Sequence, residues 1–231
     1  MAIYYGGTSK YLKWLGWKFF LWLLLAIVLI VLISYYISRI SELHYGIVML
    51  PLFLLVGLLL FVADKHALGQ KKLGKGRIGE WEIGKLLSKL PDSYYIFQDV
   101  VLGKGNIDFV VVGPSGVYAI EVKSHSGKID FDGYKLTQNG RPFDRNFLGQ
   151  AKYEAMDLKR FLEANLNRQV FVKAVLVFSG RAYMSFGFNP IDNVFVVNKD
   201  SLLRLIDYKP ILNQELINNI TSLLIRTHSR E

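Results

Sequence analysis

Two long apolar runs separate the first quarter of the chain from the rest. Phe19–Ile37 and Gly46–Ala63 contain almost no ionisable side chains. At about 1.5 Å per helical residue, each run approaches the length needed to cross a hydrocarbon core about 30 Å thick. The connection between them, Ser38–Tyr45, is short enough for a tight helical hairpin. The pattern therefore predicts two transmembrane helices, near residues 19–37 and 46–63, within a membrane anchor over residues 1–66.

Lysines and arginines flank the two runs on their outer sides and are nearly absent between them. Lys10, Lys13 and Lys18 precede the first run, and the connection has only Arg39, offset by Glu42. A second basic group follows the second run: Lys65, Lys71, Lys72, Lys75 and Arg77. The positive-inside rule then places both chain ends in the cytoplasm, as in a multi-pass protein of the inner cell membrane.

This interpretation assigns lipid contact to residues 14–63. Two alternatives stay open. A secretory signal peptide would have a shorter apolar region and a small-residue cleavage site, neither of which is evident. A buried hairpin in the core of a soluble protein would rarely contain apolar runs of this length.

After a Gly- and Lys-rich linker at residues 67–75, the polarity pattern changes to that of a globular domain at residues 76–231. Apolar residues at helical spacing predict a helix over Gly76–Leu90, which ends before Pro91. Runs rich in β-branched residues predict strands at Tyr94–Leu102, Ile107–Val112, Val117–Lys123, Gln169–Phe178 and Val194–Val197, with a hairpin over Lys128–Thr137. Further helices are expected at Asn146–Asn165, Ser201–Ile206 and Gln214–Thr227. Strands enclosed by helices predict an α/β sandwich.

Composition narrows the classes of function that remain. The chain of 231 residues has no cysteine, which excludes disulfides, cysteine nucleophiles and cysteine metal sites. Its net charge of +9 favours an anionic partner, either phospholipid headgroups or nucleic acid. The sequence shows no Gly-rich phosphate loop and no serine-nucleophile motif, so nucleotide hydrolysis and acyl transfer have no support.

The candidate chemistry lies in the hairpin built around the Gly-Pro-Ser-Gly turn. We expect Val112 to face Val117 across this turn. That register places Asp108 opposite Glu121 on one face of the hairpin. Because side chains alternate along a strand, Lys123 lies on the same face. The alternative is an ordinary cluster of charged groups at a solvated strand edge.

Two carboxylates at this separation repel each other unless a cation lies between them. Mg²⁺ or Mn²⁺ would meet that need, because such hard ions prefer oxygen ligands. A divalent ion would polarise a phosphoryl oxygen and could bind the attacking water, while Lys123 would stabilise the developing charge. The pattern thus favours metal-assisted hydrolysis of a phosphodiester.

Short segments of this region resemble, in order and spacing, the nuclease-related domain family, NERD, which is similar to the PD-(D/E)xK nucleases. They are Gly79-Glu80, Ile107–Val117, Ile120–Lys123 and Ser126–Ile129. The resemblance extends over Gly76–Leu162. It implies a restriction-endonuclease-like mixed sheet flanked by helices, within the α/β class.

The resemblance also implies roles for individual residues. Asp108 and Glu121 match the metal-binding acids, and Lys123 matches the catalytic lysine. Glu80 matches the helix carboxylate that completes the site, although its position alone would suggest a solvated surface residue. Gln150 matches the glutamine on the helix that follows the catalytic core.

Three positions qualify this comparison. Phe109 stands where the family often has histidine, and Phe147 stands where it often has proline; neither is a metal ligand in the family. His125 follows Lys123 closely, and it is either a base or phosphate contact or a loop histidine without such a role.

The expected protein is therefore a membrane-anchored nuclease that depends on Mg²⁺ or Mn²⁺ and acts on nucleic acid, in the first place DNA. A second copy of the chain is a further candidate partner, because many nucleases of this fold cut two strands as dimers. The alternative is a non-catalytic module of the same fold that binds nucleic acid or protein at the membrane.

Overall fold

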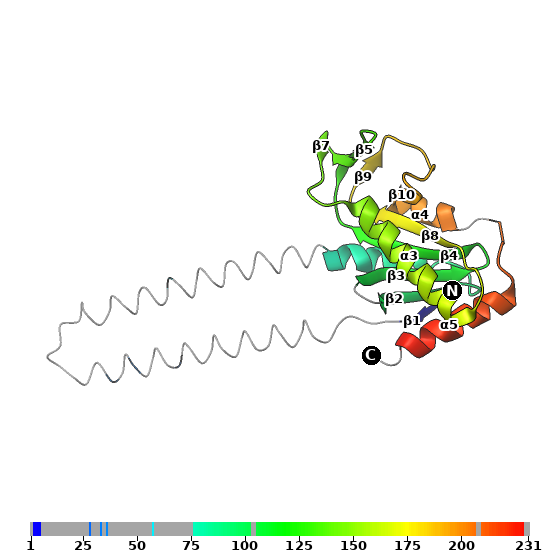
Figure 1. The fold of residues 1–231 in the computed structure, drawn as a ribbon. Helices are drawn as coiled ribbons and strands as arrows, with labels where there is room; N and C mark the ends of the chain where they lie inside the picture. Colours follow the sequence, from blue (N-terminus) through cyan, green and yellow to red (C-terminus); the bar gives the residue numbers. More distant parts are fainter. Residues whose placement is uncertain are drawn as a thin grey trace, which may run out of the picture. The chain divides into compact units, whose positions relative to one another are not determined.

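The computed structural model describes residues 2–5, 76–102, 105–206 and 209–228, together with four isolated positions. The chain divides into two compact units, Met1–Gly6 with Gly74–Glu231 and Gly7–Leu73. The first unit contains all the strands and helices discussed below (Figure 1).

The two predicted membrane spans lie outside the described residues, apart from Val28, Ile33, Tyr36 and Gly57. These four positions are helical and exposed. In the part of the chain that the structure describes, no helix combines the length and the apolar character needed to cross a bilayer. The membrane anchor therefore stays a prediction.

A six-stranded mixed sheet forms the centre of the first unit, in the order β1-β2-β3-β4-β8-β10. The strands β2 (Tyr95–Leu102), β3 (Gly105–Gly113) and β4 (Gly116–Lys123) form an antiparallel meander. β8 (Val172–Phe178) and β10 (Val194–Asn198) continue the sheet in parallel. Parallel neighbours need a crossover connection, and the one from β4 to β8 contains helix α3 (Phe147–Leu166).

The outermost strand of this sheet comes from the extreme N-terminus. β1 (Ile3–Tyr5) pairs in parallel with β2, with Ile3 opposite Tyr95 and Tyr5 opposite Phe97. The rings of Tyr5 and Phe97 stack with centroids 5.0 Å apart. The sequence does not predict this strand, because three residues are too few to show a periodicity. Residues 2–5 thus join the unit that contains the globular domain, although the hydrophobic pattern groups them with the anchor.

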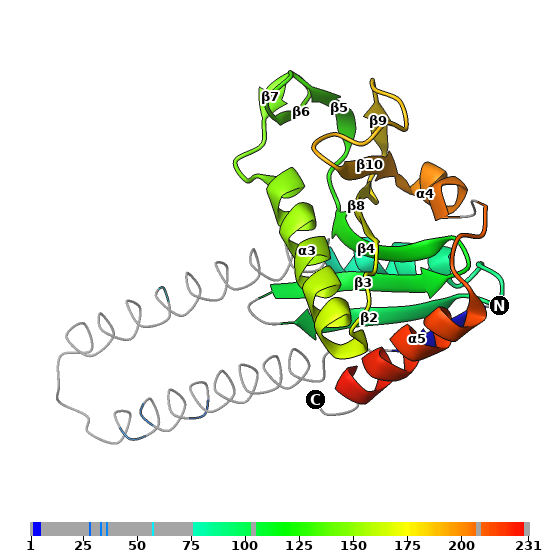
Figure 2. The same ribbon diagram turned by 45° about the vertical axis from the view of Figure 1, so that its right-hand side comes forward.

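Helices cover both faces of the central sheet (Figures 1 and 2). α3 and α5 (Gln214–His228) pack on one face, which includes Val110, Val117 and Ala119. Helix 76–87 and α4 (Lys199–Ile206) pack on the other face, against Phe109 and Tyr118. Both sides of β4 are therefore buried, which explains its continuous apolar run. The predicted class, a mixed α/β fold with helices flanking the sheet, is confirmed.

A smaller sheet extends from the carboxyl ends of β4 and β8. Its order is β7-β6-β5-β9, with bounds Arg141–Pro142, Leu136–Gln138, Gly127–Phe131 and Ala182–Met184. β5 follows β4 in the chain and β9 follows β8, so the small sheet continues from two neighbouring strands of the central sheet (Figure 2). The expected hairpin is β5–β6, while the short strand β9 is not predicted by the sequence. The small sheet stands beside the first turn of α3.

Candidate functional site

The β3–β4 hairpin has the predicted register. Val112 pairs with Val117, and the antiparallel pairing continues to Phe109 and Ile120. Beyond that point β4 stays paired with β8 as far as Lys123 and Phe178, whereas its pairing with β3 stops. Asp108 and Glu121 are the next residues of the two strands, at the place where the strands part. A parting of this kind leaves room for side chains between two strands.

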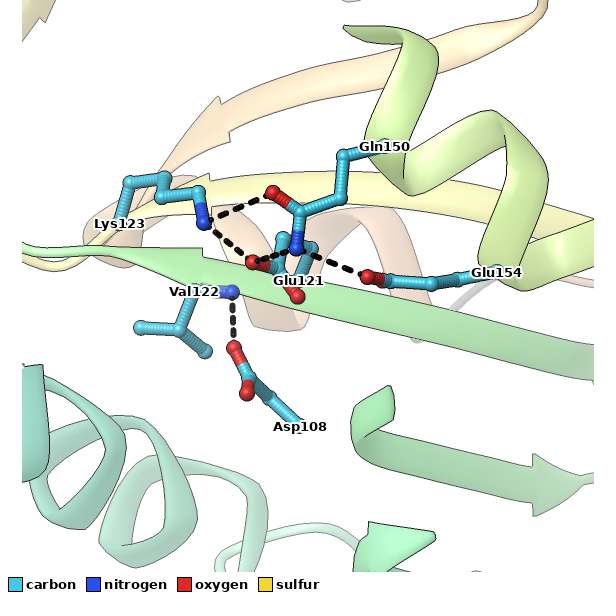
Figure 3. Close-up of polar contacts among 6 residues, drawn as sticks. All are labelled: Asp108, Glu121, Val122, Lys123, Gln150 and Glu154. Carbon is cyan, nitrogen blue, oxygen red and sulfur yellow. Dashed lines mark hydrogen bonds and ion pairs between the residues drawn. The ribbon is translucent and has the colours of Figure 1, made fainter. Parts of the chain in front are cut away.

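The carboxylate of Asp108 turns toward the backbone of β4. Its Oδ2 accepts a hydrogen bond of 2.7 Å from the amide of Val122. Burial raises the pKa of Asp108 strongly, and the negative charge of Glu121 raises it further. In Figure 3 Asp108 lies below the β4 ribbon, while Gln150 and Glu154 lie above it. The two hairpin carboxylates interact electrostatically, but Asp108 has its own backbone partner.

Four polar side chains form a connected network above β4 (Figure 3). The amine of Lys123 contacts Oε1 of Glu121 and donates to Oε1 of Gln150 at 3.1 Å. The amide nitrogen of Gln150 donates to Glu121 at 2.7 Å and to Glu154 at 2.9 Å. Glu121 is only 4% exposed and Lys123 is 17% exposed. Gln150 therefore connects the charged end of β4 to helix α3, so the structure brings together three of the predicted residues.

Glu154 is a further member of this network, and its position in the sequence is not among the predicted site residues. It is 8% exposed, and its Oε2 has no hydrogen-bond partner within the described part of the chain. Burial and the neighbouring Glu121 raise the pKa of Glu154 to about 8. A sequence signal existed: Glu154 lies on the same helix face as Ala151 and Leu158, where an acid is unexpected.

Glu80 contributes to the same electrostatic field from helix 76–87. The side chain is half-buried, and burial, Asp99 and Glu121 together raise its pKa, while Arg77 lowers it. Glu80 therefore lies within electrostatic range of Glu121. Whether Glu80 takes part in chemistry stays a prediction.

Asp99 is a further acid that the sequence analysis missed. It lies in β2 between two regular pairs, Gln98 with Phe109 and Val100 with Ile107. Its backbone has a φ of 57°, in the left-handed region, which interrupts the ladder at this residue. An acid within an apolar strand was the only available hint, because the backbone irregularity is a tertiary feature.

The N-terminal strand reaches this acidic group through Tyr4. Its hydroxyl donates a hydrogen bond to Oε1 of Gln98. Burial first, and then the charges of Asp99 and Glu80, raise the pKa of Tyr4 to about 12. Tyr4 thus stays a neutral donor beside the carboxylates.

His125 lies among aromatic rings at the carboxyl end of β4. Its ring centroid is 5.0 Å from that of Phe143 and 5.4 Å from that of Phe147. Burial and the positive charge of Lys123 lower the pKa of His125, so its imidazole is neutral at pH 7. Its Nδ1 is buried and has no partner among the described residues.

The chemistry of the donor set bears on the expected metal ion. Burial first, and then the negative charge of Glu121, raise the pKa values of Asp108 and Glu154, and a bound cation would favour the charged forms of both acids. The unpartnered Oε2 of Glu154 adds a free oxygen ligand. Among the described residues, however, no three or more acids or histidines gather as a complete ligand set. The residues fit an ion such as Mg²⁺, which commonly binds one or two carboxylates and completes its shell with water and phosphate oxygens.

Comparison with known proteins supports the family resemblance. The family model of the nuclease-related domain, NERD, matches residues 75–179. The matched segment includes all five predicted site residues together with Asp99 and Glu154. No curated protein and no solved structure matched the chain. Residues 75–179 are therefore similar to the nuclease-related domain, and β1, β9, β10, α4 and α5 lie outside the matched segment.

Proposed function

We propose that this nuclease-related domain is a divalent-metal-dependent nuclease that hydrolyses phosphodiester bonds in DNA. The observation that carries the proposal is the network of Glu121, Lys123 and Gln150 at the point where β3 and β4 part, with the carboxylate of Asp108 within electrostatic range of Glu121. An acid pair next to an amine is the arrangement that phosphodiester hydrolysis with a metal ion needs. The family match supports a nuclease-related function for the same segment.

In this proposal Asp108 and Glu121 hold Mg²⁺ or Mn²⁺. When bound, the ion supplies electrostatic polarisation of a phosphoryl oxygen and of the attacking water. The ammonium of Lys123 stabilises the negative charge that develops on the phosphate. Gln150 positions both Glu121 and Lys123 through its hydrogen bonds. Glu80 adds a carboxylate from the opposite helix layer, where it would orient water.

The test uses the full chain in detergent, because β1 belongs to the same unit as residues 74–231. Plasmid DNA is incubated with Mg²⁺ or Mn²⁺, with and without a chelator. We expect metal-dependent cleavage that falls about 100-fold or more in Asp108→Asn and Glu121→Gln. Matched controls with the same loss of charge are the exposed Asp92→Asn and Glu215→Gln. Cleavage that survives in both site variants, or persists in the chelator, would reject the site.

A second function is favoured by the partners that the acids already have. Asp108 is bonded to the Val122 amide, and Glu121 is paired with Lys123, so the described contacts satisfy part of the site without an ion. This arrangement suits a non-catalytic module that binds nucleic acid or protein. Binding of DNA or RNA without cleavage of any form of either would favour the module.

We also propose that residues 14–63 anchor the domain to the inner membrane with both chain ends in the cytoplasm. The first unit contains Met1–Gly6 and Gly74–Glu231, so the chain leaves this unit and returns to it. An even number of crossings satisfies that condition, and the two apolar runs supply two. The test is a pair of reporters fused after Glu231, one active only in the cytoplasm and one active only outside it, and we expect activity from the first alone. Activity outside the cytoplasm would overturn the orientation.

A second copy of the chain is the remaining proposed partner. Nucleases that cut both strands commonly work in pairs, and the native mass of the protein in detergent tests this directly. A mass of two chains at concentrations where plasmid is cut would support the pair, and a single chain would reject it.

A further inference from the structure

A cavity of about 810 Å³ opens beside the site, between the small sheet and the first turn of α3. Its lining comes from the end of β4, from the β6–β7 turn and from the segment that leads into α3. Pockets of roughly 300–1,000 Å³ suit a ligand of the size of a nucleotide. The cavity and the site share Lys123, so one strand of nucleic acid could contact both.

The rim of this pocket is positively charged. Arg141, Arg145 and Lys123 line it, against the single acid Asp144. Both arginines are exposed, and neither forms an ion pair with a residue that the structure describes. A guanidinium group offers a planar fork of donors that matches phosphate oxygens. The rim therefore suits a phosphodiester chain.

The inner wall of the pocket is aromatic. The rings of Phe143 and Phe147 lie with centroids 4.9 Å apart, and His125 stands edge-on to Phe143 at 5.0 Å. The Lys123 amine lies 4.8 Å from the centre of the Phe147 ring. Nucleic-acid bases stack on such rings in single-strand binding proteins, with little dependence on sequence. The neutral imidazole of His125 keeps this wall free of a further charge.

The opposite wall is held by hydrogen bonds. Asn139 accepts from the amide of Lys128 at 2.9 Å, and the Gln138 amide donates to the Ser126 carbonyl at 2.6 Å. These bonds fix the β6–β7 turn against the start of β5. The pocket is therefore formed before a ligand binds, which reduces the ordering cost of binding.

We propose that this pocket binds one unpaired nucleotide of a polynucleotide strand whose neighbouring phosphate lies at Lys123. Arg141 and Arg145 contact the phosphates, and the base lies against Phe143. A paired base would have to leave its duplex to enter, which costs free energy. Single-stranded or frayed nucleic acid is therefore preferred over blunt duplex. This inference rests on the proposed function for its substrate class, but it concerns binding, which needs no cleavage.

The experiment measures fluorescence anisotropy of labelled oligonucleotides with the full chain in detergent and a metal chelator present. The probes are a single-stranded DNA of 12 nucleotides, an RNA of the same sequence and the blunt DNA duplex. We expect Arg141→Ala and Arg145→Ala each to weaken single-strand binding about tenfold and to reduce its salt dependence. Phe143→Leu should weaken it by a similar factor through lost stacking. The matched control is Arg168→Ala, which removes an exposed arginine outside the pocket.

The outcomes separate this inference from the proposed activity. The pocket is supported if the wild type binds the duplex more weakly than the single strand, and if the three pocket variants bind the single strand less tightly than Arg168→Ala does while their duplex binding stays at the wild-type level. This holds even if the wild type cuts nothing. Variants that bind as the control does overturn the pocket, even if the wild type cuts DNA. Equal losses for duplex and single strand overturn the assignment to an unpaired nucleotide. Comparison of the DNA and RNA probes shows which sugar the pocket accepts.

Discussion

At the scale of single residues, Gln150 is the polar group with the most partners in the site. Its amide accepts from Lys123 and donates to Glu121 and Glu154. Glutamine suits this place because one side chain offers an acceptor and two donors without adding charge. Two buried acids and an amine already surround this position, and a fourth ionisable group there would unbalance their charges. The residue thus keeps the carboxylate of Glu121 and the amine of Lys123 in fixed relation.

Gln150→Leu should therefore destabilise the domain by about 1–3 kcal/mol, because two buried carboxylates lose a donor. The melting temperature in detergent checks this. Gln214→Leu is the matched control, since among the described residues the exposed side chain of Gln214 bonds that of Asn218 and no buried acid. Equal melting temperatures for the two variants would show that the network contributes no stability.

The raised pKa of Glu154 predicts the direction in which the stability of the protein changes with pH. A folded-state pKa of about 8 means that the folded protein binds this proton more tightly than the unfolded chain, in which the pKa of glutamate is near its usual value of 4.5. The free energy of unfolding should then fall as pH rises from about 4.5 to about 8. The buried Asp108 acts in the same direction. Below pH 4.5 both states hold the proton, and the effect vanishes.

Glu154→Gln removes this titration. Its melting temperature should therefore decrease less between pH 5 and pH 8 than that of the wild type. Glu215→Gln, on an exposed helix turn, should follow the wild type. A variant whose melting temperature falls as steeply as that of the wild type would contradict the burial of an ionisable Glu154. Added Mg²⁺ should stabilise the wild type more at pH 8 than at pH 5, because metal and proton compete for the carboxylates.

At the scale of elements, the sequence predicts what local patterns specify. The turn between Val112 and Val117 and the β-branched runs around it determine the register of β3 and β4, which the structure confirms. Asp99 could not be predicted as a site residue, because its acidic neighbours come from distant segments of the chain. Glu154 could not be predicted as a site residue either, because the helical periodicity shows only that an acid lies on the apolar face of α3. β1 and β9 are three residues each, and their pairing depends on tertiary contacts rather than on local preference.

β1 offers a prediction at this scale. The amide of Ile3 donates to the carbonyl of Tyr94 at 3.0 Å, at the start of the parallel pairing. Ile3→Pro removes this donor and should detach the edge strand. We expect faster hydrogen exchange of the β2 amides that face β1 and a loss of about 1–2 kcal/mol. Ile3→Val keeps the donor and should behave as the wild type; identical exchange in both variants would show that β1 does not pair in solution.

At the scale of the whole molecule, the segment that matches the family is shorter than the folded unit that contains it. The match covers residues 75–179, yet α5 buries Ile217, Ile220 and Leu224 in the core beneath the sheet. β10 and α4 cover the other end of the sheet, and β1 covers its edge. A fragment limited to the matched residues would expose the parts of β2 and β3 that α5 covers. The site residues lie in the matched segment, but the core that holds them uses the whole first unit.

The last prediction follows from this division. Replacement of residues 7–73 by a Gly/Ser linker of about 15 residues, which spans about 20 Å on average, keeps β1 attached to helix 76–87. This chain should be soluble without detergent, because both faces of its sheet are covered within the first unit. It should melt at a higher temperature than residues 74–231 alone, which lack β1 and leave the pairing groups of β2 exposed. Its DNA cleavage should equal that of the full chain in solution, since the proposed site lies wholly outside residues 7–73. Aggregation of the linked chain, or equal melting of the two fragments, would show that the segment 7–73 takes part in the fold of the domain rather than serving only as an anchor.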